Sequence, residues 1–216
     1  MWDMEYEVLQ NGEGKITEKK SVFIGAVASV HSEEEALAFI AEKKKEHYDA
    51  RHNCFAYLIG DNNEILRSSD DGEPSGTAGR PMLDVLLGAN LHNVCVVVTR
   101  YFGGVLLGTG GLVRAYTKAT EEGIKACTLL ERHIGAHMSL DMDYGLLGKV
   151  QYLLNERNIF IADSTYSDRV LFDVYVDEDE AESLKKELVN QTNAQIKIEE
   201  IENCSYGIAD GELILF

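Results

Sequence analysis

One stretch constrains the fold of this chain more than any other, because it joins a buried strand to a helix through a glycine-rich turn. Residues 94–98 read Val-Cys-Val-Val-Val, an apolar and largely β-branched run that predicts a strand buried on both faces. Five glycines follow: Gly103, Gly104, Gly108, Gly110 and Gly111. From Gly111 onward, apolar residues recur at helical spacing and predict a helix over residues 111–130.

The start of this helix is a candidate anion site. Backbone N–H groups in the first helical turn have no intrahelical partner, and the helix dipole favours negative charge there. Thr109 adds a hydroxyl, and Arg100 and Arg114 stand on either side of the glycines. The alternative is that the glycines serve only the turn and the packing of the helix on the strand.

Two phosphate-binding motifs fit this turn incompletely. Gly103 and Gly108 have the spacing of a Walker loop, but Thr109 stands where that motif needs a lysine. The run from Gly108 begins a dinucleotide fingerprint, but Val113 takes the place of its last glycine. The sequence therefore predicts an anion site with no nucleotide signature, and we expect no cofactor.

A second unusual segment, residues 69–81, reads Ser-Asp-Asp-Gly-Glu-Pro-Ser-Gly-Thr-Ala-Gly-Arg-Pro and predicts a loop that leads into a helix. Its hydroxyls, small residues and guanidinium suit a phosphate or carboxylate: Ser75, Gly76, Thr77 and Arg80. Its three carboxylates, Asp70, Asp71 and Glu73, are weak candidates for a hard cation such as magnesium. The alternative for the carboxylates is ordinary turn and cap chemistry.

Arg51 and His52 stand at the start of a predicted strand and complete the candidate site. A histidine there can serve acid–base catalysis, or it can be a hydrogen-bonded structural residue. No serine lies in a G-x-S-x-G elbow, and no cysteine has a local partner that marks it as a nucleophile. The sequence therefore names no catalytic residue.

Charge and composition narrow the classes of partner. The net charge is −17, which argues against binding of nucleic acid or membrane by the whole surface. Between Arg67 and Lys118, however, five basic residues meet four acidic ones, so the glycine-rich region is close to neutral. No apolar run approaches the ~20 residues of a membrane helix, and no signal peptide is evident. The four cysteines form no C-x-x-C pair, so we expect a cytoplasmic protein with reduced thiols.

The pattern along the chain predicts an α+β protein of two domains. Residues 5–20 are polar, with a turn at Gly12 and Gly14. A strand over 22–30, a helix from the capping box at Ser32 to about residue 47, and a hairpin over 54–68 follow. Beyond residue 132 the order is β-α-β-β-α-β, the ferredoxin-like plan. We therefore place a boundary between domains 1–131 and 132–216.

Three long motifs resemble the YigZ/IMPACT family. They are Asp49-Ala50-Arg51-His52-Asn53-Cys54, then Ser69 to Met82, then Val98 to Gly104 continuing through Leu107 to Tyr116. The resemblance covers essentially the whole chain. It implies a first domain like domain 2 of ribosomal protein S5, followed by a ferredoxin-like domain, and this pair looks like the last two domains of elongation factor G.

The resemblance also implies a link to translation. Eukaryotic relatives, which carry an additional N-terminal domain, regulate translation during amino-acid starvation through protein contacts that restrain activation of a kinase. We weigh two functions for this chain. The first is a non-enzymatic module that contacts RNA, the ribosome or a translation factor through the arginines and glycine loops, without recognising a DNA sequence. The second is an enzyme acting on a phosphorylated small molecule or nucleotide.

Overall fold

The computed structural model describes residues 5–209 and 212–215, and it divides the chain into two compact units, Met1–Glu131 and Arg132–Phe216. The first residues, on which the expectation of a cytoplasmic protein partly depends, lie outside the described ranges. The first unit contains, in order, β1 (Glu5–Gln10), β2 (Gly12–Glu18), β3 (Ser21–Ser29), α1 (Glu33–Glu46), β4 (His52–Ile59), β5 (Ile65–Ser69), α2 (Gly79–Gly88), β6 (Val94–Tyr101) and α3 (Thr109–Lys125). Strand β7 (Thr128–Met142) begins in this unit and continues into the next.

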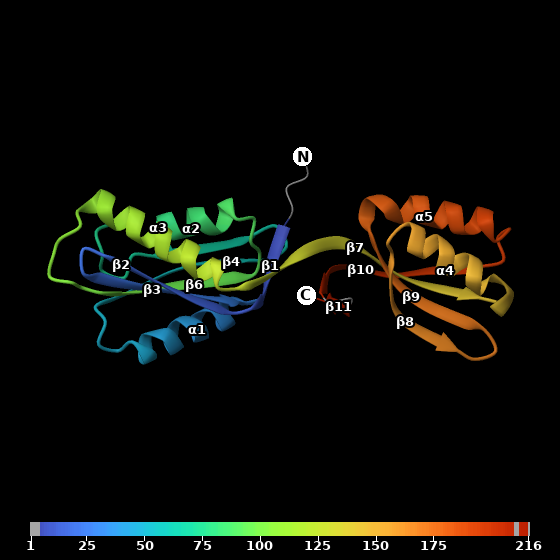
Figure 1. The fold of residues 1–216 in the computed structure, drawn as a ribbon, viewed down its shortest axis with the longest axis horizontal. Coiled ribbons are helices and arrows are strands. Elements are labelled where there is room, and N and C mark those ends of the chain that lie inside the picture. Colours follow the sequence, from blue (N-terminus) through green and yellow to red (C-terminus); the bar gives the residue numbers. More distant parts are fainter. Residues whose placement is uncertain (1–4, 210–211, 216) are drawn as a thin grey trace. The chain divides into compact units, whose positions relative to one another are not determined.

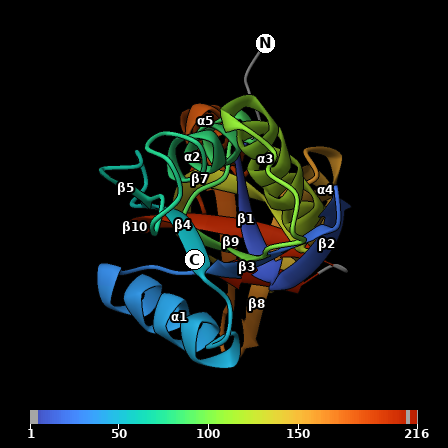
Figure 2. The same ribbon diagram turned by 90° about the vertical axis from the view of Figure 1, so that its left-hand side faces the viewer.

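The first unit is a five-stranded antiparallel sheet, in the order β2-β3-β6-β4-β5, with helices on both faces. Helices α2 and α3 cover one face and α1 covers the other (Figures 1 and 2). The central strand β6 is buried on both sides, as predicted. Its Val94, Val96 and Val98 pack in the core beneath α2 and α3, whereas Cys95 and Val97 face α1.

Helix α1 begins as its capping box predicts. The Ser32 hydroxyl accepts a hydrogen bond from the N–H of Glu35 at 3.2 Å, and the Glu35 carboxylate accepts one from the N–H of His31 at 2.7 Å. Three glutamates in the first turn and three lysines in the last turn complement the helix dipole.

Two sequence-based predictions about the first unit are wrong. Residues 5–20 form strands β1 and β2, and Gly12 and Gly14 lie within β2 instead of a turn. Helix α3 ends at Lys125, because residues 128–130 belong to β7, which pairs with β1. Strand pairing, a tertiary contact, overrides the helical spacing of the last apolar residues.

The second unit has the predicted β-α-β-β-α-β order. It contains the rest of β7, a 3-10 turn (Tyr144–Leu146), α4 (Leu147–Glu156), β8 (Phe160–Tyr166), β9 (Val170–Asp177), α5 (Glu178–Gln191), β10 (Lys197–Ala209) and β11 (Glu212–Leu215). Its antiparallel sheet has the order β11-β10-β7-β9-β8. One face packs against α4 and α5 around Phe172, Leu154 and Leu184, which form a core of their own. The division between the units falls inside β7, not in a linker.

Two further observations bear on the class of protein. Within the described ranges, no helix has the length and apolar character needed to cross a membrane. All four cysteines are free, and burial raises the pKa of Cys54 to about 12, so this thiol remains protonated at neutral pH.

Candidate functional site

The loop between β5 and α2 folds around the carboxylate of Asp70. This carboxylate accepts hydrogen bonds from the N–H groups of Gly76 at 2.8 Å, and of Ala78 and Gly79 at 2.9 Å each. Burial acts to raise the pKa of Asp70, but these backbone donors outweigh it and hold the pKa below its ordinary value. Asp70 thereby caps the start of α2, where Ala78 offers no side-chain oxygen.

The predicted anion cradle of this loop is thus already filled by an internal anion. The amide of Gly76 bonds Asp70, and the Thr77 hydroxyl donates to the carbonyl of Pro74 at 2.7 Å. Arg80 is exposed and pairs with Asp84 at 2.8 Å, one turn along α2. Three of the predicted ligand-binding groups therefore already have partners within the chain: the amide of Gly76, the hydroxyl of Thr77 and the guanidinium of Arg80.

Asp71 ties the loop to β4. Its carboxylate accepts a hydrogen bond from the N–H of Asn53 at 2.7 Å and pairs with the Lys44 ammonium at 2.9 Å. Its carbonyl lies 2.9 Å from Nδ1 of His52. Because a carbonyl can only accept, Nδ1 of His52 carries the proton, and the ring is oriented by the loop.

Glu73 and Arg100 form a buried ion pair between the loop before α2 and the end of β6, directly before the glycine-rich turn. Nη1 of Arg100 lies 2.6 Å from Oε1 of Glu73, and the Tyr116 hydroxyl donates to the same oxygen at 2.9 Å. The side chains of Arg100 and Glu73 are 6% and 4% exposed. The guanidinium carbon also lies 5.4 Å from the ring centroid of Phe23 and 5.6 Å from that of Phe102. Within the described ranges, Nε of Arg100 is buried and has no hydrogen-bond partner.

The three candidate metal ligands, Asp70, Asp71 and Glu73, therefore bind three different sets of protein groups. Asp70 holds backbone amides, Asp71 holds a backbone amide and a lysine, and Glu73 holds an arginine and a tyrosine. The turn and cap alternative describes their contacts better than shared coordination of one cation.

The glycines at the start of α3 and in the turn before it are required for different physical reasons. A methyl group on Gly103 would lie 2.0 Å from the carbonyl carbon of Lys20, so this glycine permits close backbone packing. Gly104 and Gly108 have φ angles of +81° and +73°, which L side chains rarely adopt. At Gly110 the nearest atom to such a methyl group is in the Arg114 side chain, at 3.6 Å. Packing and turn geometry thus account for the first three of these glycines but not for Gly110.

A cavity of about 470 Å³ opens between the two loops and the start of α3. Its lining combines polar and charged groups with a larger apolar part: Arg51, His52, Glu73, Pro74, Arg100, Phe102, Leu106, Leu107, Gly108, Thr109 and Leu112. Leu106 is 83% exposed and forms an apolar rim with Phe102. Several predicted site residues thus line one cavity: Arg51, His52, Arg100, Gly108 and Thr109.

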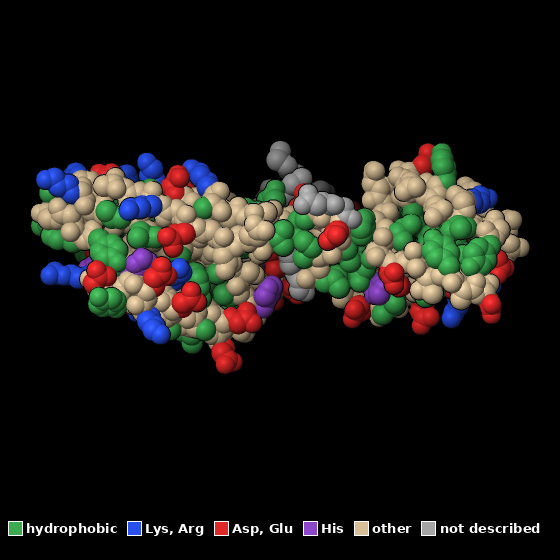
Figure 3. Space-filling view, turned by 60° about the horizontal axis from the view of Figure 1, so that its bottom comes forward, with side chains coloured by type: hydrophobic (Ala, Val, Ile, Leu, Met, Phe, Trp, Pro, Cys, Tyr) green, Lys and Arg blue, Asp and Glu red, His purple; other side chains and the backbone are tan. Residues whose placement is uncertain are grey.

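Other predicted residues lie outside this cavity. Arg114 and Gly111 line a second hollow of about 210 Å³, together with Lys19 and Lys118. In Figure 3, Lys and Arg side chains (blue) gather toward the end of the first unit where α3 begins. The sequence analysis missed the apolar part of the site, although Phe102, Leu106 and Leu107 stand among the glycines and could have signalled it.

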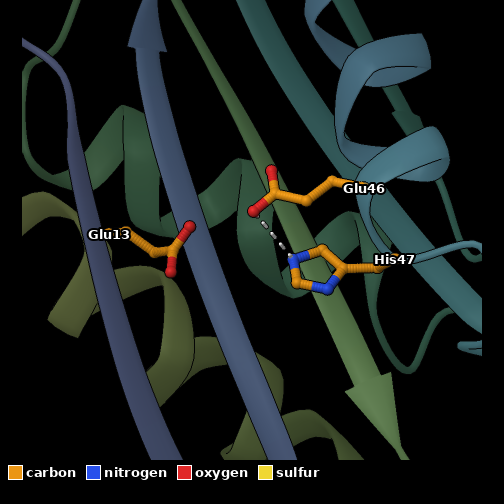
Figure 4. A group of neighbouring side chains, drawn as sticks. All are labelled: Glu13, Glu46 and His47. Atoms are coloured by element: carbon orange, nitrogen blue, oxygen red, sulfur yellow. Dashed lines mark ion pairs between the residues drawn. The ribbon is translucent and has the colours of Figure 1, made fainter.

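A second cluster unites groups that are far apart in the sequence. Figure 4 shows Glu13 of β2 beside Glu46 and His47 at the end of α1, close enough to share a metal ion. The Lys43 ammonium, however, lies 2.8 Å from Glu46 and 3.6 Å from Glu13, and so forms ion pairs with both carboxylates. No spacing in the sequence predicts this cluster, because its residues are brought together by the packing of β2 and α1.

Comparison with known proteins places these motifs in a family. The Impact N-terminal domain matches residues 19–124, and a domain of unknown function, DUF1949, matches residues 140–195. The chain is 44% identical over 195 residues to the IMPACT family member YvyE of Bacillus subtilis, covering 90% of each chain. It is 40% identical over 158 residues to YigZ of Escherichia coli, covering 72% of this chain and 78% of that one.

A solved structure is similar to the chain over nearly its whole length. A crystal structure of a hypothetical protein matches with a TM-score of 0.58 and 33% identity, covering 94% of this chain and 99% of the other. The two sequence relatives and this structure share most of their length with the chain. The chain belongs to the IMPACT family.

Proposed function

We propose that this chain is a non-enzymatic regulatory protein linked to translation, and that it contacts its partner through the cavity face of the first unit. Family membership supports the link, because the resemblance implies translational regulation by eukaryotic relatives. The single observation that carries the site is the buried Glu73–Arg100 pair, which joins the loop before α2 to the end of β6 beside one cavity. Glu73 and Arg100 are bound to each other, which favours a structural and binding role over catalysis for this pair.

Among the expected partners, the structure favours a protein surface, either of the ribosome or of a translation factor, over bare RNA. Phe102, Val105 and Leu106 are large apolar side chains that are 49%, 42% and 83% exposed beside the cavity. Exposed apolar patches of this kind mark protein contacts. The net charge of −17 opposes the general electrostatic attraction on which RNA binding depends.

We also propose a fold class for each unit. In the second unit, numbering the strands β7, β8, β9 and β10 from one to four produces the spatial order four-one-three-two. That order, with both helices on one face, supports the ferredoxin-like assignment. We assign the first unit to the class of domain 2 of ribosomal protein S5 on the family resemblance.

Co-sedimentation with purified ribosomes and pull-down with purified elongation factors test the proposal. Leu106→Asp places a charge on the exposed apolar rim and is expected to weaken partner binding about tenfold, because a carboxylate would be desolvated in the contact. Leu37→Asp is the matched control, since Leu37 is 55% exposed on α1 and does not line the cavity.

Raising the salt concentration separates protein from RNA contacts, because RNA binding weakens steeply with salt. If wild type and Leu106→Asp bind the partner equally well, the cavity face is not the contact surface. If the chain binds only short RNAs, and this binding disappears at high salt, the partner is RNA and not a protein.

A further inference from the structure

We propose that Glu13, Glu46 and His47 form a binding site for one divalent transition-metal ion of the zinc type. Figure 4 shows that the carboxylate of Glu13 on β2 and the side chains of Glu46 and His47 at the end of α1 point toward one another. One ligand atom of each residue lies within 4.8 Å of the other two. None of the three lines the cavity, so this site does not depend on the proposed function.

The alternation of side chains along β2 places Glu13 on the α1 side of the sheet. Methyl groups on its neighbours Gly12 and Gly14 would collide with the backbone at the end of α3, so these two positions face α3. Successive residues of a strand point to opposite faces, so Glu13 points toward α1. Helix α1 ends at Glu46, and the negative end of the helix dipole favours a cation there.

A hydrogen-bonded chain determines which nitrogen of His47 carries the ring proton. Nδ1 of His47 lies 3.0 Å from the hydroxyl oxygen of Tyr101, and that hydroxyl donates to the Asp49 carboxylate at 3.0 Å. Burial and the Asp49 carboxylate raise the pKa of Tyr101, so its hydroxyl is protonated at neutral pH. Because that single proton is given to Asp49, the Tyr101 oxygen can only accept from His47, and Nδ1 carries the proton. Histidines that bind metals are oriented in this way.

The other nitrogen, Nε2 of His47, lacks a partner of its own. It is buried, has no hydrogen-bond partner among the described residues, and lies 3.9 Å from Oε1 of Glu46. A bare imidazole nitrogen and a carboxylate oxygen are both acceptors, so they repel each other. Either a second ring proton or a metal ion between the two atoms removes this repulsion. A metal ion is smaller than a water molecule, so it fits between ligand atoms that water cannot reach.

The charge of the cluster favours the dication. Two carboxylates contribute −2 and the Lys43 ammonium +1, which leaves −1 around the neutral imidazole. Lys43 bonds Oε2 of Glu46, whereas Oε1 faces His47, so one carboxylate can hold the ammonium and the metal on different oxygens. The ammonium then orients a metal-binding carboxylate, as groups behind metal ligands commonly do.

The donor atoms select the kind of ion. Imidazole nitrogen suits zinc and its neighbours in the first transition series, whereas magnesium prefers oxygen. Zinc binds these atoms at about 2.0–2.2 Å, so ligands on opposite sides of the ion lie up to about 4.4 Å apart. Small rotations of the exposed Glu13 and Glu46 side chains would reduce the span of 4.8 Å to that value. Water would complete the coordination, and the ion would link β2 to α1.

Isothermal titration calorimetry with the untagged, chelator-treated full chain tests the site. We expect one tight Zn²⁺ per chain, with Mg²⁺ bound at least about tenfold more weakly. His47→Gln and Glu13→Gln each remove one ligand and should weaken Zn²⁺ binding at least about tenfold. The matched controls are the exposed His31→Gln and Glu18→Gln, the latter on the same strand; both lie outside the cluster and should change binding less than about twofold.

Nitrogen-15 NMR of the imidazole rings distinguishes a metal ion from a second ring proton. At mildly alkaline pH, where an ordinary imidazole is neutral, metal-free His47 should have a proton on Nδ1 and none on Nε2, and Zn²⁺ should shift the Nε2 resonance. Tyr101→Phe removes the oxygen that fixes this tautomer, so it should produce a mixture of tautomers and weaken Zn²⁺ binding about tenfold. Failure to bind Zn²⁺, unchanged binding by His47→Gln or Glu13→Gln, or a proton on Nε2 of the metal-free protein would overturn the proposal.

Discussion

At the scale of single residues, the carboxylates of the loop before α2 bind other groups of the protein, although the sequence made them candidate metal ligands. Asp70 accepts three backbone hydrogen bonds, and Glu73 neutralises Arg100 in the interior. Arg100 therefore cannot be removed as a simple test of function. Truncating one partner of a buried ion pair costs about 3–5 kcal/mol, because the other charge is left unpaired.

Replacing Asp70 should destabilise the protein. In Asp70→Asn, a neutral amide replaces the carboxylate that accepts hydrogen bonds from the N–H groups of Gly76, Ala78 and Gly79. We therefore expect the free energy of unfolding to decrease by about 2–3 kcal/mol. Urea denaturation at neutral pH measures this decrease. The exposed Ser75→Ala serves as the control and should stay within about 0.5 kcal/mol of wild type.

The difference between wild type and Asp70→Asn should depend on pH. Because the pKa of Asp70 is lowered in the folded state, its contribution to stability is present above the unfolded-state pKa and is lost as the pH falls through the folded-state pKa. The two proteins should therefore converge in stability in strong acid. A constant difference across that range would show that Asp70 does not act through its charge.

At the scale of elements, glycines determine how closely α3 lies on β2 and β3. A methyl group on Gly14 would lie 2.3 Å from the carbonyl carbon of Glu122, and one on Gly25 would lie 2.3 Å from the carbonyl oxygen of Ala119. A methyl group on Gly123 of the helix would lie 2.7 Å from the carbonyl oxygen of Gly25. This contact positions the start of α3, and with it the cavity, relative to the sheet.

We expect Gly25→Ala to destabilise the protein by about 1–3 kcal/mol, because helix and sheet must move apart. Thermal denaturation followed by circular dichroism measures the change. Gly88→Ala, at the end of α2, is the control: no atom lies within 4 Å of the added methyl group, and it should leave stability unchanged or raise it by up to about 1 kcal/mol. Equal stability of Gly25→Ala and wild type would refute the close contact.

At the scale of the whole molecule, the chain forms two compact units, each with its own core. Leu86 belongs to the core of the first and Leu184 to that of the second, and both are fully buried. Cutting the chain at residue 131 would divide β7, which runs through the boundary. Core substitutions are therefore a cleaner test of independence than truncation.

We expect Leu184→Ala to cost about 2–5 kcal/mol and to lower hydrogen-exchange protection in the second unit alone. Leu86→Ala should produce the converse pattern, with loss of protection in the first unit. Exchange measured by mass spectrometry resolves the two. Loss of protection throughout the chain in both variants would show one cooperative unit.

Local pattern determined much of this structure. The β-branched run of β6, the capping box of α1 and the strand–helix order of the second unit are properties of neighbouring residues, so they can be recognised without tertiary contacts. Several of the residues that the motifs singled out also line one cavity: Arg51, His52, Arg100, Gly108 and Thr109.

Only the tertiary structure decided what each of these side chains does. Glu73 meets Arg100 across 27 positions of sequence, and β2 receives α3 through glycines that a local pattern assigns to a turn. Burial and pairing depend on residues that are distant in the chain, and they convert carboxylates from candidate metal ligands into caps and counter-ions. Local sequence therefore specifies elements and their ends, whereas long-range packing determines which polar groups remain available to a ligand.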